Sequence, residues 1–435
     1  MVKKKNFFKT LALTLAMSLA APFAGSVYAK EVEPTIVSEA AIVMDYDTGE
    51  IVYEKNANEK MYLASTTKVM TALLFAESKA KKDTLTYTEE ALAQPPYTMN
   101  SEQMAPYGKS LKVGDTLDAD TVMKELLLFS GNDAAYMIAD NVSGDSKTFV
   151  DEMNKRAEEL GLSSTHFENP NGLPGTKEDG TSGDVNYSTA YELAIITREA
   201  FKNDWVRETM ALSEANVILP GDTRIKIENR NTELGKNGNI GGKTGVTNDA
   251  GTCFAGVYER DGRKLVGVVL KSDRNDNNKR FEDLNSMMDY SYPLEKEVYK
   301  ASGEEVGTME LEYKLFGFFG PKKTISTTIN LAEDVKLYPN DINDTEAKIT
   351  LNNKQEQSAW KVASDNKVDL SVNVMQYTED VKGTVDITVG SLIKANLIIY
   401  IAVVVGIVII IVLIIFIVKV IANGNRRRRS RRRRY

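Results

Sequence analysis

An uncharged apolar run near the end of the chain constrains its organisation more than any other feature. The run extends over 22 residues, from Leu397 to Val418. Because an α-helix rises about 1.5 Å per residue, a run of this length covers the roughly 30 Å hydrocarbon core of a bilayer. The sequence therefore predicts one transmembrane helix at residues 397–418.

A basic tail follows this run at residues 419–435. It contains two blocks of arginines, 426–429 and 431–434, and no acidic residue. Arginines beside a span hold that side of the membrane protein in the cytoplasm. We therefore expect a single-pass protein of the cell membrane, with the C-terminus cytoplasmic and the body of the chain extracellular. A tail that binds RNA or lipid is the alternative interpretation.

The N-terminus has the pattern of a secretory signal. Lysines at positions 3, 4, 5 and 9 precede a short apolar run, Leu11 to Ala21. Val27-Tyr28-Ala29 then offers a cleavage site that ends in a small residue, with no cysteine behind it for a lipid anchor. Residues 1–29 are therefore predicted to be a signal peptide. An uncleaved anchor is disfavoured because the apolar run is too short to span a bilayer comfortably.

Charge is distributed unevenly between the two ends and the body. Of the 54 lysines and arginines, four lie in residues 1–29 and nine in residues 396–435, and neither segment contains an acidic residue. The body thus combines 41 basic with 61 acidic side chains, a net charge of −20. We do not expect such a body to bind nucleic acid or to be attracted to an anionic membrane surface.

The chain contains one histidine, His166, and one cysteine, Cys253. A single cysteine forms no internal disulfide, and a zinc hydrolase normally uses two or three histidine ligands. We therefore expect neither a metal nor another cofactor. No G-x-S-x-G nucleophile elbow occurs in the sequence. His166 lies in a turn-rich stretch and is interpreted as a loop residue without a catalytic role, and Cys253 as a packed core thiol.

Apolar periodicity predicts a mixture of helices and strands before residue 292. Two Val- and Leu-rich segments flank Asp261-Gly262, a strong hairpin signal. Thr189 and Glu192 have the spacing of a capping box, and residues 84–118, with their prolines, are interpreted as a long surface excursion. The predicted helices cover residues 65–80, 121–129, 133–141, 146–160, 189–201 and 278–290, and the predicted strands residues 40–44, 51–53, 250–259 and 263–271.

The pattern changes after Tyr292-Pro293. Short segments of alternating polar and apolar residues follow, such as residues 367–374. Such alternation is typical of half-buried strands. We therefore expect a small all-β domain at residues 296–390, after a main domain at residues 30–295.

Three short motifs carry the chemistry: Ser65-Thr66-Thr67-Lys68, Ser130-Gly131-Asn132 and Lys243-Thr244-Gly245. Each is weak alone, because a serine often caps a helix, S-G-N is an ordinary turn and a loop lysine is usually solvated. Their order and context favour a shared site. The first motif is predicted to open an amphipathic helix, the second to join two helices, and the third to precede a β-hairpin.

The first motif has the residues of a nucleophile and its base. Ser65 and Lys68 lie on one helix face, in the positive field of a helix N-terminus, which disfavours a protonated lysine. Burial and a second cation such as Lys243 would lower the pKa of Lys68 further. Neutral Lys68 could then activate Ser65, Ser130 could pass a proton to a leaving amine, and a strand with Lys243 and Thr244 could align an extended peptide.

With these motifs the sequence resembles the penicillin-binding proteins, in particular the low-molecular-mass serine D-alanyl-D-alanine carboxypeptidases. The resemblance covers residues 35–292 and implies an α+β fold. That fold is a penicillin-binding-protein/β-lactamase-like catalytic domain, in which an antiparallel sheet with helices is joined to a helical cluster. A small all-β domain and one transmembrane helix follow it. The matching stretches are residues 64–74, 128–135, 166–173 and 241–256.

The resemblance also implies roles for single residues. Ser65, Lys68 and Ser130 would be catalytic, and the substrate would bind to Asn132, Lys243, Thr244 and Gly245. An arginine beyond the hairpin would help to bind the substrate carboxylate, for which Arg274 and Arg280 both remain candidates. Several members of this family lie on the membrane through an amphipathic helix, whereas this chain has a full span.

The expected function is hydrolysis of the terminal D-alanine from peptidoglycan stem peptides, through an acyl-enzyme on Ser65 that β-lactams such as penicillin inhibit. Two alternatives stay open. A membrane-tethered serine β-lactamase would use a glutamate to activate water, for which Glu168 is the candidate. A penicillin sensor or wall-binding protein would bind without catalysis, although a tail of residues 419–435 is short for an output domain.

Overall fold

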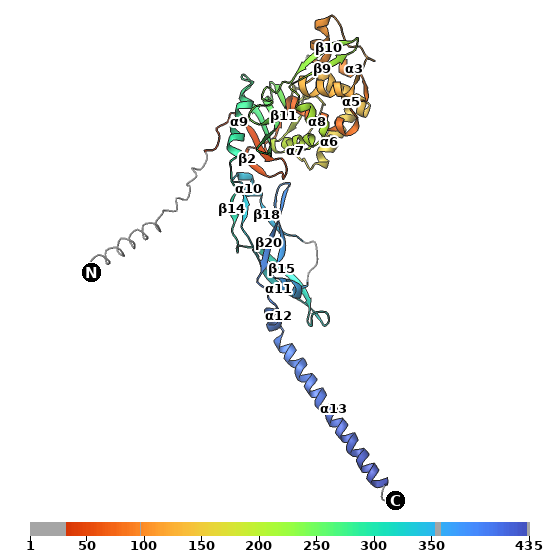
Figure 1. The fold of residues 1–435 in the computed structure, drawn as a ribbon, viewed down its shortest axis with the longest axis vertical. Helices are drawn as coiled ribbons and strands as arrows, with labels where there is room; N and C mark the ends of the chain where they lie inside the picture. Colours follow the sequence, from red (N-terminus) through yellow and green to blue (C-terminus); the bar gives the residue numbers. More distant parts are fainter. Residues whose placement is uncertain (1–31, 96, 353–357, 433–435) are drawn as a thin grey trace, which may run out of the picture.

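The computed structural model describes residues 32–95, 97–352 and 358–432, with the backbone alone beyond Arg426. Figure 1 shows three parts along the chain: a mixed α/β part, a narrower β-rich part, and a long terminal helix. We call residues 32–291 the head and residues 297–395 the stalk. The predicted signal peptide, residues 1–29, lies outside the described residues.

An antiparallel sheet of five strands forms the centre of the head, in the order β11-β12-β13-β1-β2. The hairpin predicted at Asp261-Gly262 is confirmed as β12 with β13, and the strands predicted at residues 40–44 and 51–53 pair as β1 with β2. The hairpin of β12 and β13 turns at Asp261-Gly262, where φ is 51° and 82°, the left-handed geometry of a tight hairpin turn. The strands are β1 (Ala40–Asp45), β2 (Ile51–Lys55), β11 (Asn239–Thr247), β12 (Gly251–Arg260) and β13 (Arg263–Ser272).

Both faces of this sheet are buried under helices. Successive residues of a strand point to opposite sides, so each strand contributes side chains to two cores. On β13, Val266 joins the core under helix α7 (Ala190–Lys202), and Leu265 joins the core under helix α9 (Lys279–Ser291). Helix α9 confirms the helix predicted at residues 278–290. It packs closely at Gly267, where a Cβ would lie 2.4 Å from the side chain of Leu284 in α9.

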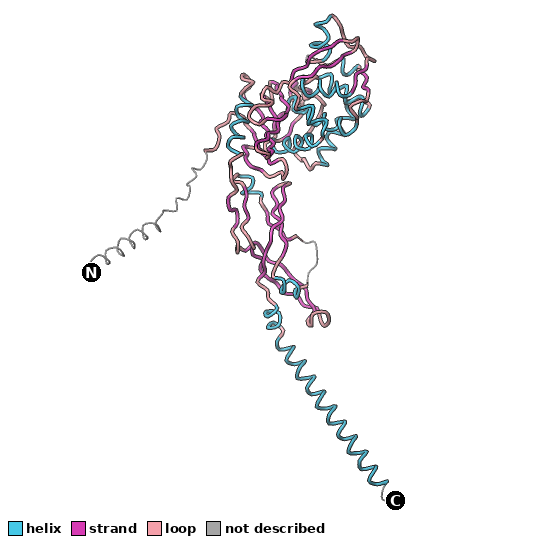
Figure 2. The backbone as a smooth tube through the Cα atoms, in the orientation of Figure 1, coloured by secondary structure: helices cyan, strands magenta, loops and turns pink. Residues whose placement is uncertain are grey.

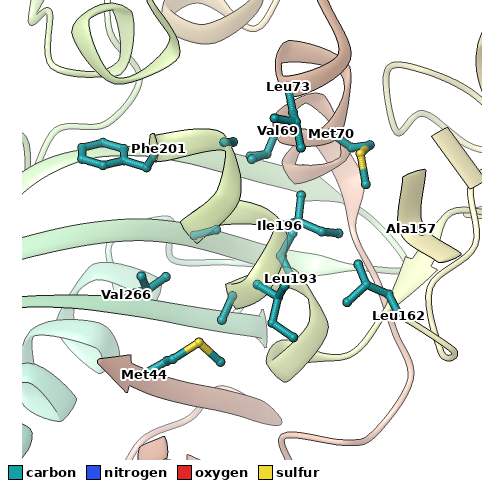
Figure 3. Packing of buried hydrophobic residues seen from close by; sticks show 14 of the residues in the cluster. Met44, Val69, Met70, Leu73, Ala157, Leu162, Leu193, Ile196, Phe201 and Val266 are labelled. Carbon is teal, nitrogen blue, oxygen red and sulfur yellow. The ribbon is translucent and has the colours of Figure 1, made fainter. Parts of the chain in front are cut away.

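A cluster of helices packs on the sheet through α7. Figure 3 shows the contact: Val69 and Leu73 of α2 face Ile196 of α7, with Met44 and Val266 of the sheet beyond. The cluster confirms the helices predicted between residues 121 and 160, with small shifts at their ends. It consists of α2 (Lys68–Ser78), α4 (Ala119–Lys124), the π-helix η4 (Glu125–Phe129), α5 (Asn132–Ser143), α6 (Ser146–Glu159) and α8 (Asp204–Met210).

Residues 84–118 are not the surface excursion that their prolines suggested. Tyr87, Met99 and Met104 are buried in the helical cluster, because the apolar side chains of this segment pack against it. The prediction was wrong because it rested on the prolines and not on these apolar side chains. The segment contains β4 (Thr84–Thr86), α3 (Glu89–Leu92), the π-helix η2 (Met99–Met104), the 3₁₀ helix η3 (Ala105–Tyr107) and β5 (Thr116–Asp118).

The capping box predicted before α7 is only half formed. The side chain of Thr189 accepts a hydrogen bond from the Glu192 amide, as expected. The Glu192 carboxylate instead accepts bonds from the Ser164 amide and the Thr165 hydroxyl, and so fastens a neighbouring loop. Short paired strands complete the head: β3 (Met61–Tyr62) with β8 (Tyr187–Ser188), β6 (Gly175–Thr176) with β7 (Ser182–Gly183), and β9 (Glu214–Leu219) with β10 (Thr223–Glu228).

The stalk contains a five-stranded sheet in the order β15-β16-β20-β19-β18 and a separate pair, β14 with β17. It also contains helices, so the expected all-β composition is wrong, although strands dominate. Its strands are β14 (Glu297–Lys300), β15 (Glu305–Lys314), β16 (Lys322–Leu331), β17 (Val335–Leu337), β18 (Lys348–Leu351), β19 (Val368–Val374) and β20 (Tyr377–Val385). Its helices are α10 (Asp341–Glu346), α11 (Ala359–Asp365) and α12 (Val389–Ala395).

Polar contacts lock the stalk to the head. The Asn340 and Asn343 side-chain amides both donate to the carbonyl of Ile51, each at 3.1 Å. Lys296, immediately before the stalk, has its ammonium group 2.8 Å from the carboxylate of Glu50, whose side chain is only 4 % exposed. These bonds join the stalk to β2 and to the turn before it, at the edge of the central sheet.

Helix α13 (Leu397–Arg432) extends from the end of the stalk away from the rest of the molecule (Figure 2). Its segment Leu397–Arg426 is long and apolar enough to cross a membrane, and its most apolar stretch is not buried within the protein. It is the one helix among the described residues that meets this criterion. The predicted span at residues 397–418 thus lies wholly within one exposed apolar helix.

Candidate active site

The three motifs meet at one cleft of about 600 Å³ in the head. Ser65, Ser130 and Asn132 line it together with Thr244 and Gly245. Lys68 and Lys243 lie behind this lining and are 0 % and 1 % exposed. The structure thus brings together all seven residues predicted for the site, from the helical cluster on one side and from the edge strand β11 on the other.

Ser65 lies in a 3₁₀ turn, η1 (Ala64–Thr67), rather than in the α-helix predicted from residue 65. The α-helix begins at Lys68. Ala64, just before the serine, has a φ of +47°, a left-handed conformation that is costly for a residue with a side chain. The strained turn presents Ser65 at the cleft while the helix behind it carries the lysine.

Two glycines allow other segments to approach this turn closely. Gly172 has a φ of +79°, and a Cβ there would lie 1.9 Å from the carbonyl oxygen of Ala64. A Cβ on Gly245 of β11 would lie 3.1 Å from the amide nitrogen of Ser65. The turn is therefore clamped between a loop and an edge strand, and only backbone atoms fit on either side of it.

The Lys68 ammonium group has three hydrogen-bond partners. Its Nζ lies 3.0 Å from Ser65 Oγ, 2.9 Å from Asn132 Oδ1 and 2.8 Å from the carbonyl oxygen of Asn171. An amide or carbonyl oxygen can only accept, so two N–H groups of the amine point at Asn132 and Asn171. In the neutral amine the lone pair therefore faces Ser65, as a base for its hydroxyl requires.

Burial lowers the pKa of Lys68 to about 7, and the nearby Arg230 lowers it while Asp133 raises it. The expected interaction between Lys68 and Lys243 is present, since Lys68 lowers the pKa of Lys243, and Arg230 is a further cation that lowers the pKa of both lysines. The sequence prediction missed Arg230 because it lies far along the chain and in no motif. A pKa near 7 leaves a large share of Lys68 neutral at neutral pH, which suits a general base.

Ser130 faces Lys243 across the cleft. The Lys243 ammonium donates to Ser130 Oγ at 2.8 Å and to the Thr244 carbonyl at 2.9 Å. Burial lowers the pKa of Lys243 well below its usual range, and Lys68, Arg230 and Arg280 lower it further. Ser130 itself has a φ of +74°, in the left-handed region, where the chain leaves η4 to begin α5. The second motif thus supplies a hydroxyl held by a buried lysine.

Arginines surround the outer part of the cleft. The Arg230 guanidinium lies over the rings of Tyr97 and Phe129, 4.7 and 4.9 Å from their centroids, and donates to the Phe129 carbonyl. Arg280 of α9 is 6 % exposed and donates to the carbonyl of Gly245 at 3.3 Å. None of the described residues that line the cleft is acidic. This part of an acidic molecule therefore favours a negatively charged group.

Arg280 and Arg274 differ in how they are held. Both line the cleft. Arg280 is buried against β11 and the Phe281 ring, and its Nε has no protein partner. Arg274 is exposed and bonds only to the side chain of Asn248 among its described contacts. Of the two guanidinium groups, that of Arg280 is the more firmly fixed, a distinction that spacing along the sequence did not permit.

A buried carboxylate supports the rim of the cleft at Tyr97. Asp133 accepts hydrogen bonds from the Met99 and Asn100 amides and from the Tyr87 hydroxyl. The Asn132 amide in turn donates to the Tyr97 carbonyl at 2.9 Å. Burial raises the pKa of Asp133 to about 6. The residue after the second motif therefore positions the segment that carries Tyr97.

Three other residues weighed from the sequence lie outside the cleft lining. The His166 ring nitrogen contacts the Glu168 carboxylate at 2.5 Å, and both side chains are exposed. Glu168, the candidate for water activation in a β-lactamase, is thus exposed and does not line the cleft. Cys253 is fully buried in β12, as predicted, and burial raises the pKa of its thiol to about 11. A thiol in this environment is not reactive.

The site combines a serine beside a buried, partly neutral lysine with a second hydroxyl bonded to another buried lysine. This arrangement defines a serine enzyme that works through an acyl-enzyme intermediate. The family model described as D-alanyl-D-alanine carboxypeptidase, Peptidase_S11, matches residues 27–274. This match covers more than half of the chain, and the chain belongs to that family. The predicted class, a serine-type carboxypeptidase, is thereby confirmed.

Individual relatives agree with this family. The D-alanyl-D-alanine carboxypeptidase DacF of Bacillus subtilis is 29 % identical over 297 residues, 66 % of this chain and 71 % of the relative. The D-alanyl-D-alanine carboxypeptidase of Streptomyces sp. K15 is 31 % identical over 296 residues, 65 % of this chain and 97 % of the relative. Both matches leave about a third of this chain uncovered.

Solved structures show the same fold. A putative penicillin-binding protein homologue from Mycobacterium tuberculosis superposes with a TM-score of 0.55 at 27 % identity, over 62 % of this chain and 96 % of that one. Penicillin-binding protein D2 from Listeria monocytogenes, in its cefotaxime-bound form, gives 0.50 at 30 % identity, over 60 % and 100 %. The predicted α+β penicillin-binding-protein fold is confirmed.

Proposed function

We propose that this chain removes the terminal D-alanine from peptidoglycan stem peptides through an acyl-enzyme on Ser65. The observation that carries this proposal is the position of Lys68 Nζ, 3.0 Å from Ser65 Oγ with its two other partners restricted to accepting. Lys68 is the base, Ser130 the proton donor, and Asn132, Lys243, Thr244 and Gly245 bind the substrate.

Acylation transfers one proton from Ser65 to the leaving nitrogen by way of Lys68 and Ser130. Neutral Lys68 takes the hydroxyl proton of Ser65 as Oγ bonds to the carbonyl carbon of the penultimate D-alanine. The C–N bond to the last D-alanine breaks, and the leaving nitrogen takes the Ser130 hydroxyl proton. The Lys68 ammonium then reprotonates Ser130, while Lys243 stabilises the developing negative charge on the Ser130 oxygen. Lys68 is neutral again at the end of the step.

Hydrolysis reuses the same base. Water attacks the ester carbon and gives a proton to Lys68, which passes it to Ser65 Oγ as the ester bond breaks. The exposed position of Glu168 favours this route over the β-lactamase alternative, because no acidic side chain among the described cleft residues could activate water. A slowly hydrolysed acyl-enzyme with penicillin is therefore expected, which makes β-lactams inhibitors rather than good substrates.

The chemistry of the cleft fits a peptide that ends in a free carboxylate. Strand β11 is an edge strand of the sheet, so an extended peptide can pair with it as an added strand. Thr244 and Arg280 then lie at the end of the cleft where a terminal carboxylate would be bound. The anchoring helix and the positive-inside rule support an extracellular head and a cytoplasmic C-terminus, with the substrate in the wall outside the membrane.

The test is release of D-alanine from a short peptide that ends in D-Ala-D-Ala, with the full chain in detergent. We expect release by the unaltered protein and none by Ser65→Ala. Ser78→Ala is the matched control, because Ser78 begins a second S-x-x-K sequence at the end of the same helix and should leave the rate unchanged. Equal activity in Ser65→Ala, or no activity in any form, would contradict the proposal.

A further inference from the structure

The turn between β15 and β16 exposes aromatic side chains at the end of the stalk nearest α13. We call residues 315–321 the aromatic turn. Phe318 is 84 % and Phe319 53 % exposed, although their rings contact each other at 5.0 Å between centroids. Backbone bonds from Leu315 to Pro321 and from Phe316 to Phe319 close the turn. Adjacent exposed phenylalanines on an ordered turn indicate a surface that another apolar phase covers.

The aromatic turn is fastened to the first turn of α13. The Tyr400 hydroxyl donates to the Leu315 carbonyl at 2.6 Å, and the Tyr400 and Phe316 rings meet edge-on at 5.7 Å. The Asn396 amide donates to the Tyr313 hydroxyl, and the Lys323 ammonium donates to Asn396. The turn is therefore held at a fixed position along the axis of the helix.

The position of Tyr400 in the apolar run gives the depth at which the turn would lie in a bilayer. Tyr400 is the fourth residue of the apolar run, so it lies about 4.5 Å along the axis from the start of the run. Tyrosines and tryptophans concentrate at this depth, at the boundary between headgroups and acyl chains. A turn bonded to Tyr400 must lie at the same boundary when α13 is in a bilayer.

An apolar hollow lies beside the turn. It has a volume of about 490 Å³ and is lined by Leu315, Phe316, Gly317, Trp360, Ile393 and Tyr400. Two lysines are near neighbours of residues at the hollow: Lys394 follows Ile393 in α12, and Lys323 donates to Asn396. Lys322 instead pairs with Glu312. An apolar hollow near cationic side chains, at the level of the headgroups, fits a lipid better than a peptide.

We propose that the aromatic turn is a second membrane contact, which inserts Phe318 and Phe319 into the outer boundary of the bilayer that holds α13. The hollow beside it then takes an acyl chain. This inference rests on the proposed membrane anchoring by α13. It concerns apolar insertion and does not require the acidic body to be attracted to lipid charge.

The test places an environment-sensitive fluorophore at position 318 of the full chain in phosphatidylcholine vesicles. Cys253 is replaced by alanine and the label is attached to Phe318→Cys. The matched control is Met375→Cys, an apolar residue 42 % exposed at the β19–β20 turn of the same sheet. The turn next to Met375 contacts the head, where Gln376 donates to the Leu160 carbonyl. A label at Ile410→Cys reports whether α13 is inserted.

We expect lipids with a nitroxide high on the acyl chain to quench the label at position 318 at least threefold more than the label at 375. Quenching at 410 without quenching at 318 would overturn the inference and leave the anchoring intact. A blue-shifted but unquenched label at 318 would show protein cover, such as a second copy of the chain, and would also overturn it. No quenching at 410 would refute the anchoring and the inference together.

Discussion

The cleft and the aromatic turn break the usual distribution of residues in opposite ways. At the cleft, Lys68, Lys243 and Arg280 are at most 6 % exposed, whereas at the far end of the stalk Phe318 is 84 % exposed. Ionisable side chains are ordinarily outside and aromatic rings inside. Each exception costs stability in water, so each marks a place where another molecule completes the environment. A negatively charged substrate would do so at the cleft and lipid at the turn.

The largest effect should come from removing the base. Lys68→Met should slow the acylation of Ser65 by about 10³-fold or more, because base catalysis and the orientation of the hydroxyl are both lost. The measurement is the rate of labelling by a fluorescent penicillin, with circular dichroism to check the fold. Lys226→Met, at an exposed lysine on β10, should label at the normal rate. Rapid labelling of Lys68→Met would show that the base lies elsewhere.

A second prediction concerns the glycine that clamps the nucleophile turn. Gly172→Ala should lower the free energy of unfolding by about 3 kcal/mol, from left-handed strain and overpacking against Ala64. It should also reduce D-alanine release strongly, because the turn must shift. Gly180→Ala is the control, since Gly180 has a similar φ of +80° but no atom within 4 Å. It should cost about 1 kcal/mol and leave the rate intact. Equal effects of the two changes on activity would refute the clamp.

The third prediction is a pH profile. Because Lys68 must be neutral to accept a proton and its pKa is lowered to about 7, acylation should rise with pH through about 7 and then level off. Arg230→Gln removes the cation that lowers this pKa, so the rise should move to higher pH. A profile that keeps its midpoint in Arg230→Gln would contradict this role for Arg230.

The same pKa also affects stability. The folded pKa of Lys68 lies below its unfolded value of 10.5, so the unfolded chain binds more protons between about pH 7 and 10.5. This group therefore makes the protein more stable as pH rises through that window. The gain should disappear in Lys68→Met, as chemical denaturation at several pH values would show.

The smallest effect should come from the aromatic turn when no membrane is involved. Phe318→Ser with Phe319→Ser should change the free energy of unfolding in detergent by less than about 0.5 kcal/mol each, because both side chains are exposed. Release of D-alanine from a soluble peptide should be unchanged. A large loss of stability would mean that these rings are part of the folded core of the stalk.

The sequence predicted those site residues that belong to short local motifs and missed those that only the tertiary structure brings to the site. Ser65, Lys68, Ser130 and Lys243 were found because their motifs fix residue types at short spacings. Arg230 was missed because its role depends on stacking with Tyr97 and Phe129, which only the tertiary structure brings beside it. The backbone carbonyl of Asn171, a partner of Lys68, was missed because any residue type supplies a carbonyl.

The fold shows the same limit. Hairpins and amphipathic helices were predicted well, because turn residues and periodicity are local. The strained 3₁₀ turn at Ser65 was predicted to be an α-helix, because Gly172 and Gly245, far away in the chain, impose its geometry. The boundary between residues 295 and 296 stays a prediction about independent folding.

The locked junction between head and stalk has a consequence for where the enzyme can work. Asn340, Asn343 and the Lys296–Glu50 pair oppose bending between the two. Under the proposed anchoring by α13, the cleft would therefore be carried at a nearly constant distance from the membrane. A tethered catalyst samples only a thin layer, in which its effective concentration is high, and is absent elsewhere. The length of the stalk would then determine which strands of the wall the cleft can reach, by their distance from the membrane rather than by their chemistry.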